Sequence, residues 1–186
     1  SVLYLDMGGY TALKDVTIMG GGTLEIITDS PDGFDANSSN RTLKIYDSSL
    51  IITNIRTSSS AYCISKHFRV YPVNSQITLK AANSATDMAY IAELKGCEVT
   101  TGTLSDTSLK GVKDPVTNWS TAVISKSAAP YEYILFSKSP ETKYIVDWAN
   151  LPVIEAEAIT SNTQPVTYKW YDANTNAEIC TGSTYT

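Results

Sequence analysis

Short segments of alternating apolar residues recur along the first half of the chain at steps of about 26 residues. Three series of such segments follow one another in constant order. The first series is VTI (16–18), LKI (43–45), FRV (68–70) and CEV (97–99). The second is LEI (24–26), LII (50–52) and ITL (77–79), and the third is GYTA (9–12), GFDA (33–36), AYCI (61–64) and AYIA (89–92). Recurrence at a fixed period constrains the fold strongly, because each cycle must form the same supersecondary unit.

Each cycle predicts three short strands joined by turns, since alternation with a period of two puts every second side chain on one face. One cycle cannot bury its apolar face alone, whereas stacked cycles bury a continuous core. The sequence therefore predicts an all-β fold, a right-handed parallel β-helix with three strands and about 26 residues per coil. The expected inward stacks are Val16/Leu43/Phe68/Cys97, Ile18/Ile45/Val70/Val99, Leu24/Leu50/Ile77, Ile26/Ile52/Leu79, Tyr10/Phe34/Tyr62/Tyr90 and Ala12/Ala36/Ile64/Ala92. We expect the aromatic stack to lie in the core; a platform for sugars is the alternative.

The regular pattern ends near residue 100. TAVIS (121–125) and YEYILFS (131–137) are expected to be strands of a closing rung or cap, because the last coil of a stacked fold leaves an unpaired edge. We therefore assign residues 1–140 to a parallel β-helix with a C-terminal cap.

The character of the sequence changes from residue 141 onward. VIEAEAIT (153–160) alternates strictly, and VTYKWYDA (166–173) precedes an Asn-rich turn. Trp170 stands where strand C of an immunoglobulin-like domain carries its core Trp, and Ala156 or Ala158 stands where antibody domains carry Cys. Residues 141–186 thus resemble part of a disulfide-free bacterial Ig-like domain; the alternative is that these strands extend the β-helix.

The strand pair KIYDSSLIIT (44–53) and the element DGFDA (32–36) resemble the repeats of secreted bacterial β-helix proteins of the carbohydrate-binding, pectate-lyase-like type. The resemblance covers about residues 9–99. It implies a secreted or surface protein, and some members of such families bind plant polysaccharide and calcium. Lyases of this type need a catalytic Arg or Lys beside several acids on one strand face. Arg41, Arg56 and Arg69 fall in different parts of the cycle, so lyase chemistry is not expected.

An acidic turn lies between two of the apolar segments. It places Asp29, Asp32 and Asp35 within seven positions, with Pro31 and Gly33 between them. Carboxylates in a bent loop are ligands that Ca²⁺ prefers, so calcium is the candidate cofactor at these three residues. Two alternatives stay open: a plain turn, and a catalytic edge in which two of the acids flank a sugar.

Composition excludes several classes of function. The net charge of −5 and pI of about 4.8 argue against a nucleic-acid partner, which needs a basic face. No apolar run approaches the ~20 residues that span a bilayer. The three Cys form no CxxC pair, which argues against a zinc site. A catalytic Ser-His-Asp triad or Cys-His pair could use only His67. Abundant Ser, Thr and Asn, with 12 Tyr against 3 Phe, favour an extracellular or cell-surface β-protein.

These features predict a non-catalytic secreted or cell-surface module for recognition or adhesion, with polysaccharide or glycan as its partner. One alternative is a polysaccharide-active lyase or hydrolase built on a β-helix. The other is a structural surface stalk. We expect no enzyme activity, since no convincing set of catalytic residues is visible in the sequence.

Overall fold

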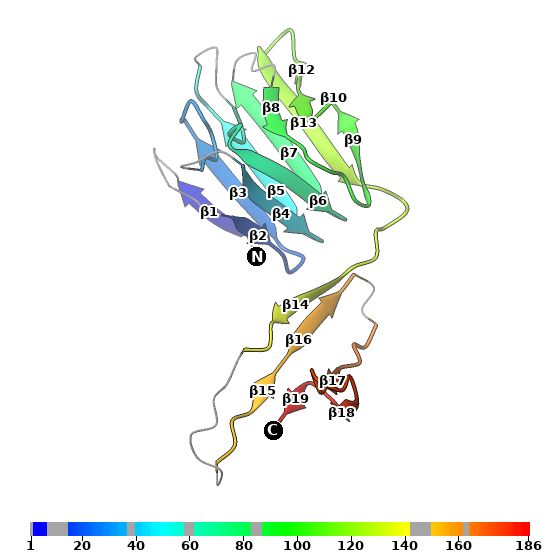
Figure 1. Cartoon of the computed structure of the whole chain (residues 1–186). Coiled ribbons are helices and arrows are strands. Elements are labelled where there is room, and N and C mark those ends of the chain that lie inside the picture. Colours follow the sequence, from blue (N-terminus) through cyan, green and yellow to red (C-terminus); the bar gives the residue numbers. More distant parts are fainter. Residues whose placement is uncertain are drawn as a thin grey trace. The chain divides into compact units, whose positions relative to one another are not determined.

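A computed structural model describes residues 2–6, 15–36, 40–57, 62–82, 87–141, 150–161 and 164–186 (Figure 1). The described residues contain strands and no helix, so the prediction of an all-β chain is confirmed for them. Two compact units divide the chain, Ser1–Tyr131 and Glu132–Thr186; the expected domain boundary after residue 140 stays a prediction.

The described residues of the first unit form thirteen strands. They are β1 (Val2–Asp6), β2 (Val16–Ile18), β3 (Thr23–Thr28), β4 (Arg41–Tyr46), β5 (Ser49–Asn54), β6 (Phe68–Val73), β7 (Gln76–Ala82), β8 (Asp87–Tyr90), β9 (Cys97–Thr101), β10 (Thr103–Ser105), β11 (Ser108–Lys110), β12 (Val112–Lys113) and β13 (Trp119–Lys126).

Strands β1, β3, β5 and β7 form a parallel series (Figure 1). Paired positions of β3, β5 and β7 lie 26 or 27 residues apart, whereas those of β1 and β3 lie 21 residues apart. Leu50 lies opposite Leu24 on one side and Ile77 on the other. Ile52 pairs in the same way with Ile26 and Leu79. Both of these expected stacks are confirmed, and their side chains face a single buried core. Leu24 is partly buried there, and the other five side chains of the two stacks have no solvent exposure.

Strands β2, β4 and β6 form a second parallel sheet. Val16 lies opposite Leu43, as expected, but Leu43 then lies opposite Val70, and Phe68 lies opposite Arg41. The expected Leu43/Phe68 and Ile45/Val70 pairs are therefore wrong by two residues. A shift of two positions leaves every side chain on its own face, so the alternation alone does not detect it.

The expected aromatic ladder is also wrong. Phe34 bridges to Ile64 and not to Tyr62, and it stacks instead on Phe68 with 5.3 Å between ring centroids. Tyr62 and Tyr90 are half-exposed, and the Arg69 guanidinium lies 5.3 Å from the Tyr90 ring. The Ala36/Ile64/Ala92 stack fails with the same shift, because Ile64 already faces Phe34. Tyr10 and Ala12 lie outside the described residues.

In the fourth cycle the continuous parallel pairing of strands is reduced to isolated parallel bridges. Val70 bridges to Ile91, so the expected Val70/Val99 and Phe68/Cys97 pairs are wrong. Strand β9, which contains Cys97 and Val99, pairs antiparallel with β13. Strand β13 in turn pairs antiparallel with β7, and it contains the segment 121–125 that we expected as a strand of the closing region.

Where the structure describes the second unit, it has six short strands in three antiparallel pairs. They are β14 (Ile134–Lys138) with β16 (Glu157–Thr160), β15 (Ile154–Glu155) with β19 (Thr184–Tyr185), and β17 (Lys169–Tyr171) with β18 (Glu178–Thr181). Trp170 stacks on Tyr185 with 5.8 Å between ring centroids, and its indole N–H donates to the Gly182 carbonyl. Ala156 is buried.

The two adjacent isoleucines of β3 test the assignment of inner and outer faces. Ile26 is fully buried, whereas Ile27 is 45% exposed. We expect Ile26→Ala to lower the free energy of unfolding by about 2–5 kcal/mol through loss of burial and cavity formation. The matched Ile27→Ala change should cost less than about 1 kcal/mol. Urea denaturation followed by circular dichroism measures both, and equal losses would contradict the stacking register.

Candidate functional site

The acidic turn between β3 and β4 does not gather its three carboxylates. The Asp35 carboxylate lies 3.1 Å from the His67 ring nitrogen Nδ1. Burial of the Tyr62 ring raises the pKa of its hydroxyl, and nearby Asp32 adds to that shift. The backbone carbonyl of Asp29 accepts from Arg56 at 3.1 Å. Over the ranges that the structure describes, no three His, Cys, Asp or Glu side chains are placed to hold a metal ion, so the calcium site stays a prediction.

Local hydrogen bonds and a glycine shape this turn. The Ser30 hydroxyl accepts from the Asp32 N–H at 3.3 Å, and the Ser30 carbonyl accepts from the Gly33 N–H at 3.2 Å. Gly33 has a φ of 63°, and a Cβ there would lie 2.4 Å from the carbonyl oxygens of Tyr62 and Cys63. The chain therefore needs glycine here because the backbone of the next repeat passes too close for any side chain.

Substitution of Gly33 tests this close approach. We expect Gly33→Ala to destabilise the fold by at least about 3 kcal/mol, since it adds a backbone clash to the cost of a left-handed φ. Gly21 is the matched control, because its φ is 74° and its nearest neighbour would be an oxygen at 3.8 Å. Gly21→Ala should cost only about 1–2 kcal/mol. Thermal unfolding compares the two, and a smaller loss for Gly33→Ala would contradict the close approach.

The single histidine forms a local contact with the acidic turn. The His67 Nδ1 atom lies 3.1 Å from Asp35 Oδ1 and 3.0 Å from the Ala36 carbonyl oxygen. Both of these atoms only accept hydrogen bonds, so Nδ1 carries a proton. The Ser65 hydroxyl accepts from the backbone N–H of His67 at 3.2 Å. The pair accordingly ties the turn to the start of β6.

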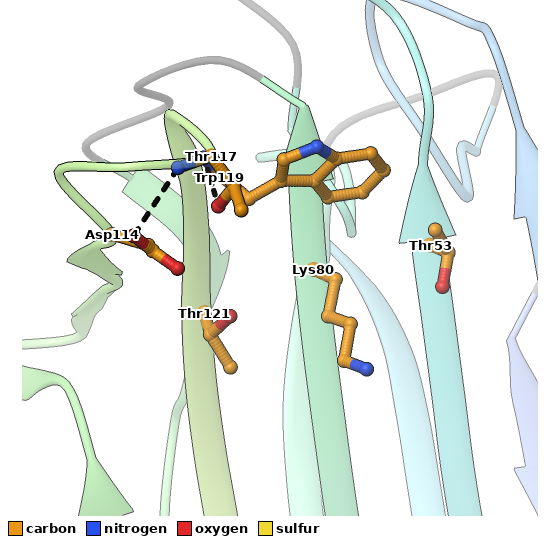
Figure 2. A pocket seen from close by; sticks show the side chains of 6 residues that line it. All are labelled: Thr53, Lys80, Asp114, Thr117, Trp119 and Thr121. Atoms are coloured by element: carbon orange, nitrogen blue, oxygen red, sulfur yellow. Dashed lines mark hydrogen bonds between the residues drawn. The ribbon is translucent and has the colours of Figure 1, made fainter.

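A hollow of about 430 Å³ opens on the outer face of the sheet formed by β5, β7 and β13. Six residues line it: Thr53, Lys80, Asp114, Thr117, Trp119 and Thr121 (Figure 2). The volume lies within the range of about 300–1,000 Å³ that is usual for small-molecule sites. We regard this hollow as the candidate functional site.

The floor of the hollow is a polar row that crosses three strands. Strand register places Lys80 of β7 directly between Thr53 of β5 and Thr121 of β13. Neighbouring strands lie about 4.8 Å apart, so the backbone positions of the two threonines flank that of Lys80 at regular spacing. The next residues along these strands, Leu79 and Ala122 among them, are buried, so the alternation that fills the core also builds this row.

The wall of the hollow is Trp119, the first residue of β13. In Figure 2 its indole points from β13 toward the strand that carries Thr53, whereas the Lys80 side chain extends along its own strand, away from the indole. The ring is half-exposed. A half-exposed indole presents an apolar face together with one N–H donor.

The loop between β12 and β13 positions this indole. The Asp114 N–H donates to the Trp119 carbonyl at 2.8 Å, and the Asn118 N–H donates to the Asp114 carbonyl at 2.9 Å. The Asp114 carboxylate accepts from the N–H groups of Val116 at 2.7 Å and Thr117 at 3.3 Å. These two backbone donors hold the pKa of the Asp114 carboxyl below its ordinary value.

The lining side chains favour binding over catalysis. They supply hydroxyl groups, one ammonium, one carboxylate and one indole. Hydrolysis of a glycosidic bond ordinarily uses two carboxylates, and within this described lining only Asp114 provides one. The arrangement can hold a polar ligand that also has an apolar face.

Sequence reasoning did not single out any residue of this hollow. Thr53 and Lys80 occupy outward positions of the repeat, and alternation marks such positions only as exposed. Trp119 lies in the irregular stretch after residue 100, where the repeat gives no register. The available signal was a lone Trp next to an alternating strand, preceded by the turn-forming residues Asp114, Pro115 and Asn118.

Comparison with known proteins gives no match to a family model, to a curated protein or to a solved structure. In the part of the chain that is described, no helix is long and apolar enough to cross a membrane.

The depressed pKa of Asp114 predicts a pH dependence of its loop. Its folded-state pKa lies below the ordinary value of 3.8, so the stabilisation from its two accepted N–H bonds is complete above about pH 3.8. That stabilisation should be lost as the pH falls through the lower, folded-state pKa. Carboxyl ¹³C NMR measures the titration directly, and a midpoint for Asp114 at or above 3.8 would contradict the hydrogen bonding described here.

Proposed function

We propose that this chain is a non-catalytic, secreted or cell-surface recognition module that binds polysaccharide or glycan in the hollow beside Trp119. The observation that carries the proposal is a half-exposed indole beside a Thr-Lys-Thr row on an open sheet face. Sugar rings have an apolar C–H face and a rim of hydroxyl groups. An indole fits the first and a row of donors and acceptors fits the second.

The scaffold in this proposal is a right-handed parallel β-helix. Two features support it: two parallel sheets whose strands alternate along the chain from β2 to β7, and in-register pairs at steps of about 26 residues. Parallel strands joined by crossover connections are right-handed in almost all cases. Strand β13 then acts as the cap, because it covers the edge of β7 in the antiparallel direction.

The second unit is proposed to be a partial Ig-like segment that serves as a spacer. Its support is the stacking of Trp170 on Tyr185 among short antiparallel strands. In this proposal the unit has no part in ligand binding.

Two alternatives remain distinct from this proposal. A hydrolase would need a second acid in the hollow, and the described lining supplies only Asp114. A lyase would need several acids beside a basic residue, and the described lining places Lys80 with that one acid. A structural stalk has no need for an indole on an open face, since burying that surface would stabilise the fold. Calcium, if bound at Asp29, Asp32 and Asp35, would act away from the hollow, because none of these three residues lines it.

Binding to defined oligosaccharides tests the proposal. We expect the intact chain to bind at least one of cellohexaose, xylohexaose, mannohexaose and hexagalacturonate in calorimetry, with or without added calcium. Trp119→Ala should weaken that binding at least about tenfold, because the stacking surface is lost. Lys80→Ala should weaken it about three- to tenfold through loss of a donor.

The control is Lys110→Ala, since Lys110 is an exposed lysine that does not line the hollow. It should bind like the unchanged chain. If the intact chain binds none of the four sugars or a wider glycan array, the recognition hypothesis fails and the stalk gains support. If Trp119→Ala binds as tightly as the intact chain, the binding site is elsewhere.

A further inference from the structure

Two hairpin loops in this chain, one in each unit, share the same six-residue pattern. Residues 114–119 read DPVTNW and join β12 to β13, whereas residues 172–177 read DANTNA and join β17 to β18. Both loops follow the pattern D-x-x-T-N-x, and in both the Asn has a left-handed backbone: φ is 68° at Asn118 and 54° at Asn176.

The hydrogen bonds of the second loop repeat those of the first one by one. The Asp172 N–H donates to the Ala177 carbonyl at 2.9 Å, and the Asn176 N–H donates to the Asp172 carbonyl at 2.8 Å. The Asp172 carboxylate accepts from the N–H groups of Asn174 at 2.9 Å and Thr175 at 2.8 Å. The corresponding Asp114 bonds have the same donors and acceptors at the equivalent positions.

The Thr of each loop adds a further shared bond. The Thr117 hydroxyl oxygen accepts from the Trp119 N–H at 3.4 Å, as the Thr175 hydroxyl oxygen does from the Ala177 N–H at 3.3 Å. In the first loop every backbone N–H therefore has an acceptor, because Pro115 has no N–H to satisfy.

The loops differ in what they present. The position after the Asn is Trp119 in one loop and Ala177 in the other. The first loop also contributes Asp114 and Thr117 to the lining of the hollow. The same bonded frame thus closes a plain hairpin in the second unit and carries the indole of the candidate site in the first.

We propose that Asp114 is a positioning residue for ligand binding: its carboxylate fixes the loop so that Trp119 is held ready beside the Thr-Lys-Thr row. This inference rests on the proposed function. Without the carboxylate, the N–H groups of Val116 and Thr117 lose their acceptor and the loop gains other conformations. Ordering those conformations on binding then costs affinity, which a preorganised loop avoids.

Three variants test the role of Asp114 by calorimetry with whichever of the four hexasaccharides the intact chain binds best. Asp114→Ala should weaken binding about three- to tenfold, the scale expected when a capping carboxylate is lost. Asp114→Asn should recover most of the affinity, because its side-chain carbonyl still accepts from the two N–H groups. Asp172→Ala removes the same bonds from the twin loop and should leave binding unchanged.

Amide hydrogen exchange by NMR provides a readout that does not depend on the sugar. In Asp114→Ala the Val116 and Thr117 amides should exchange faster, whereas the amides of Ala122 and Ile124 in β13 should keep their protection. Should Asp114→Ala fail to fold, Asn118→Ala and Asn118→Gly replace it. The Ala variant strains the left-handed backbone and should weaken binding, whereas the Gly variant should not.

Each outcome separates this inference from the proposed function. If Trp119→Ala abolishes binding but Asp114→Ala binds like the intact chain, the positioning role is overturned and the glycan site stands. If Asp114→Asn is as weak as Asp114→Ala, the carboxylate acts through its charge on the sugar, which also overturns positioning. If Asp172→Ala weakens binding equally, the effect is general destabilisation and the inference fails. If Trp119→Ala changes nothing, the proposed function itself fails.

Discussion

In-register parallel pairing of backbone strands is the constraint on which the rest of the first unit depends. Each of β3, β5 and β7 donates to and accepts from its neighbours along the whole strand, so like positions of successive repeats stand side by side. This pairing stacks Leu and Ile inward into a continuous buried core. Because side chains alternate, it equally forces Thr53 and Lys80 into one outward row. The same strand register therefore forms the core on the inner face of the sheet and the floor of the candidate site on its outer face.

The sequence predicts this register where turn length is constant and misses it elsewhere. The 26-residue spacing alone placed Leu24, Leu50 and Ile77 opposite one another. The same spacing misplaced Phe68 by two positions, because the similar patterns of LKI and FRV suggest that these segments pair directly. A shift of two residues leaves every side chain on the same face, so the alternation does not reveal the error. In the observed register Phe68 packs against Phe34, a contact between residues of different series. Alternation within one strand contains no information about it.

The candidate site was harder to predict, because it combines residues of the regular repeat with residues of an irregular stretch in which no period fixes their positions. Thr53 and Lys80 come from the repeat, whereas Trp119 arrives on an antiparallel strand after an irregular stretch. The sequence instead suggests an ion site in the acidic turn, where three carboxylates lie within seven positions. The three residues instead have different partners. The Asp35 carboxylate contacts His67, the Asp29 carbonyl accepts from Arg56, and the Asp32 N–H donates to Ser30. Close spacing in sequence does not bring side chains together when a turn directs them apart.

Because β13 pairs antiparallel with β7 at the end of the parallel series, the residues that line the hollow do not depend on how many repeats precede β5. The described lining of the hollow comes from β5, β7 and the β12–β13 hairpin, and each strand of a stacked array interacts chiefly with its immediate neighbours. Duplication or deletion of a 26-residue unit before β5 would therefore lengthen or shorten the scaffold while leaving the hollow intact. If the chain binds glycan as proposed, a change in repeat number would alter the reach of the module without altering its binding site.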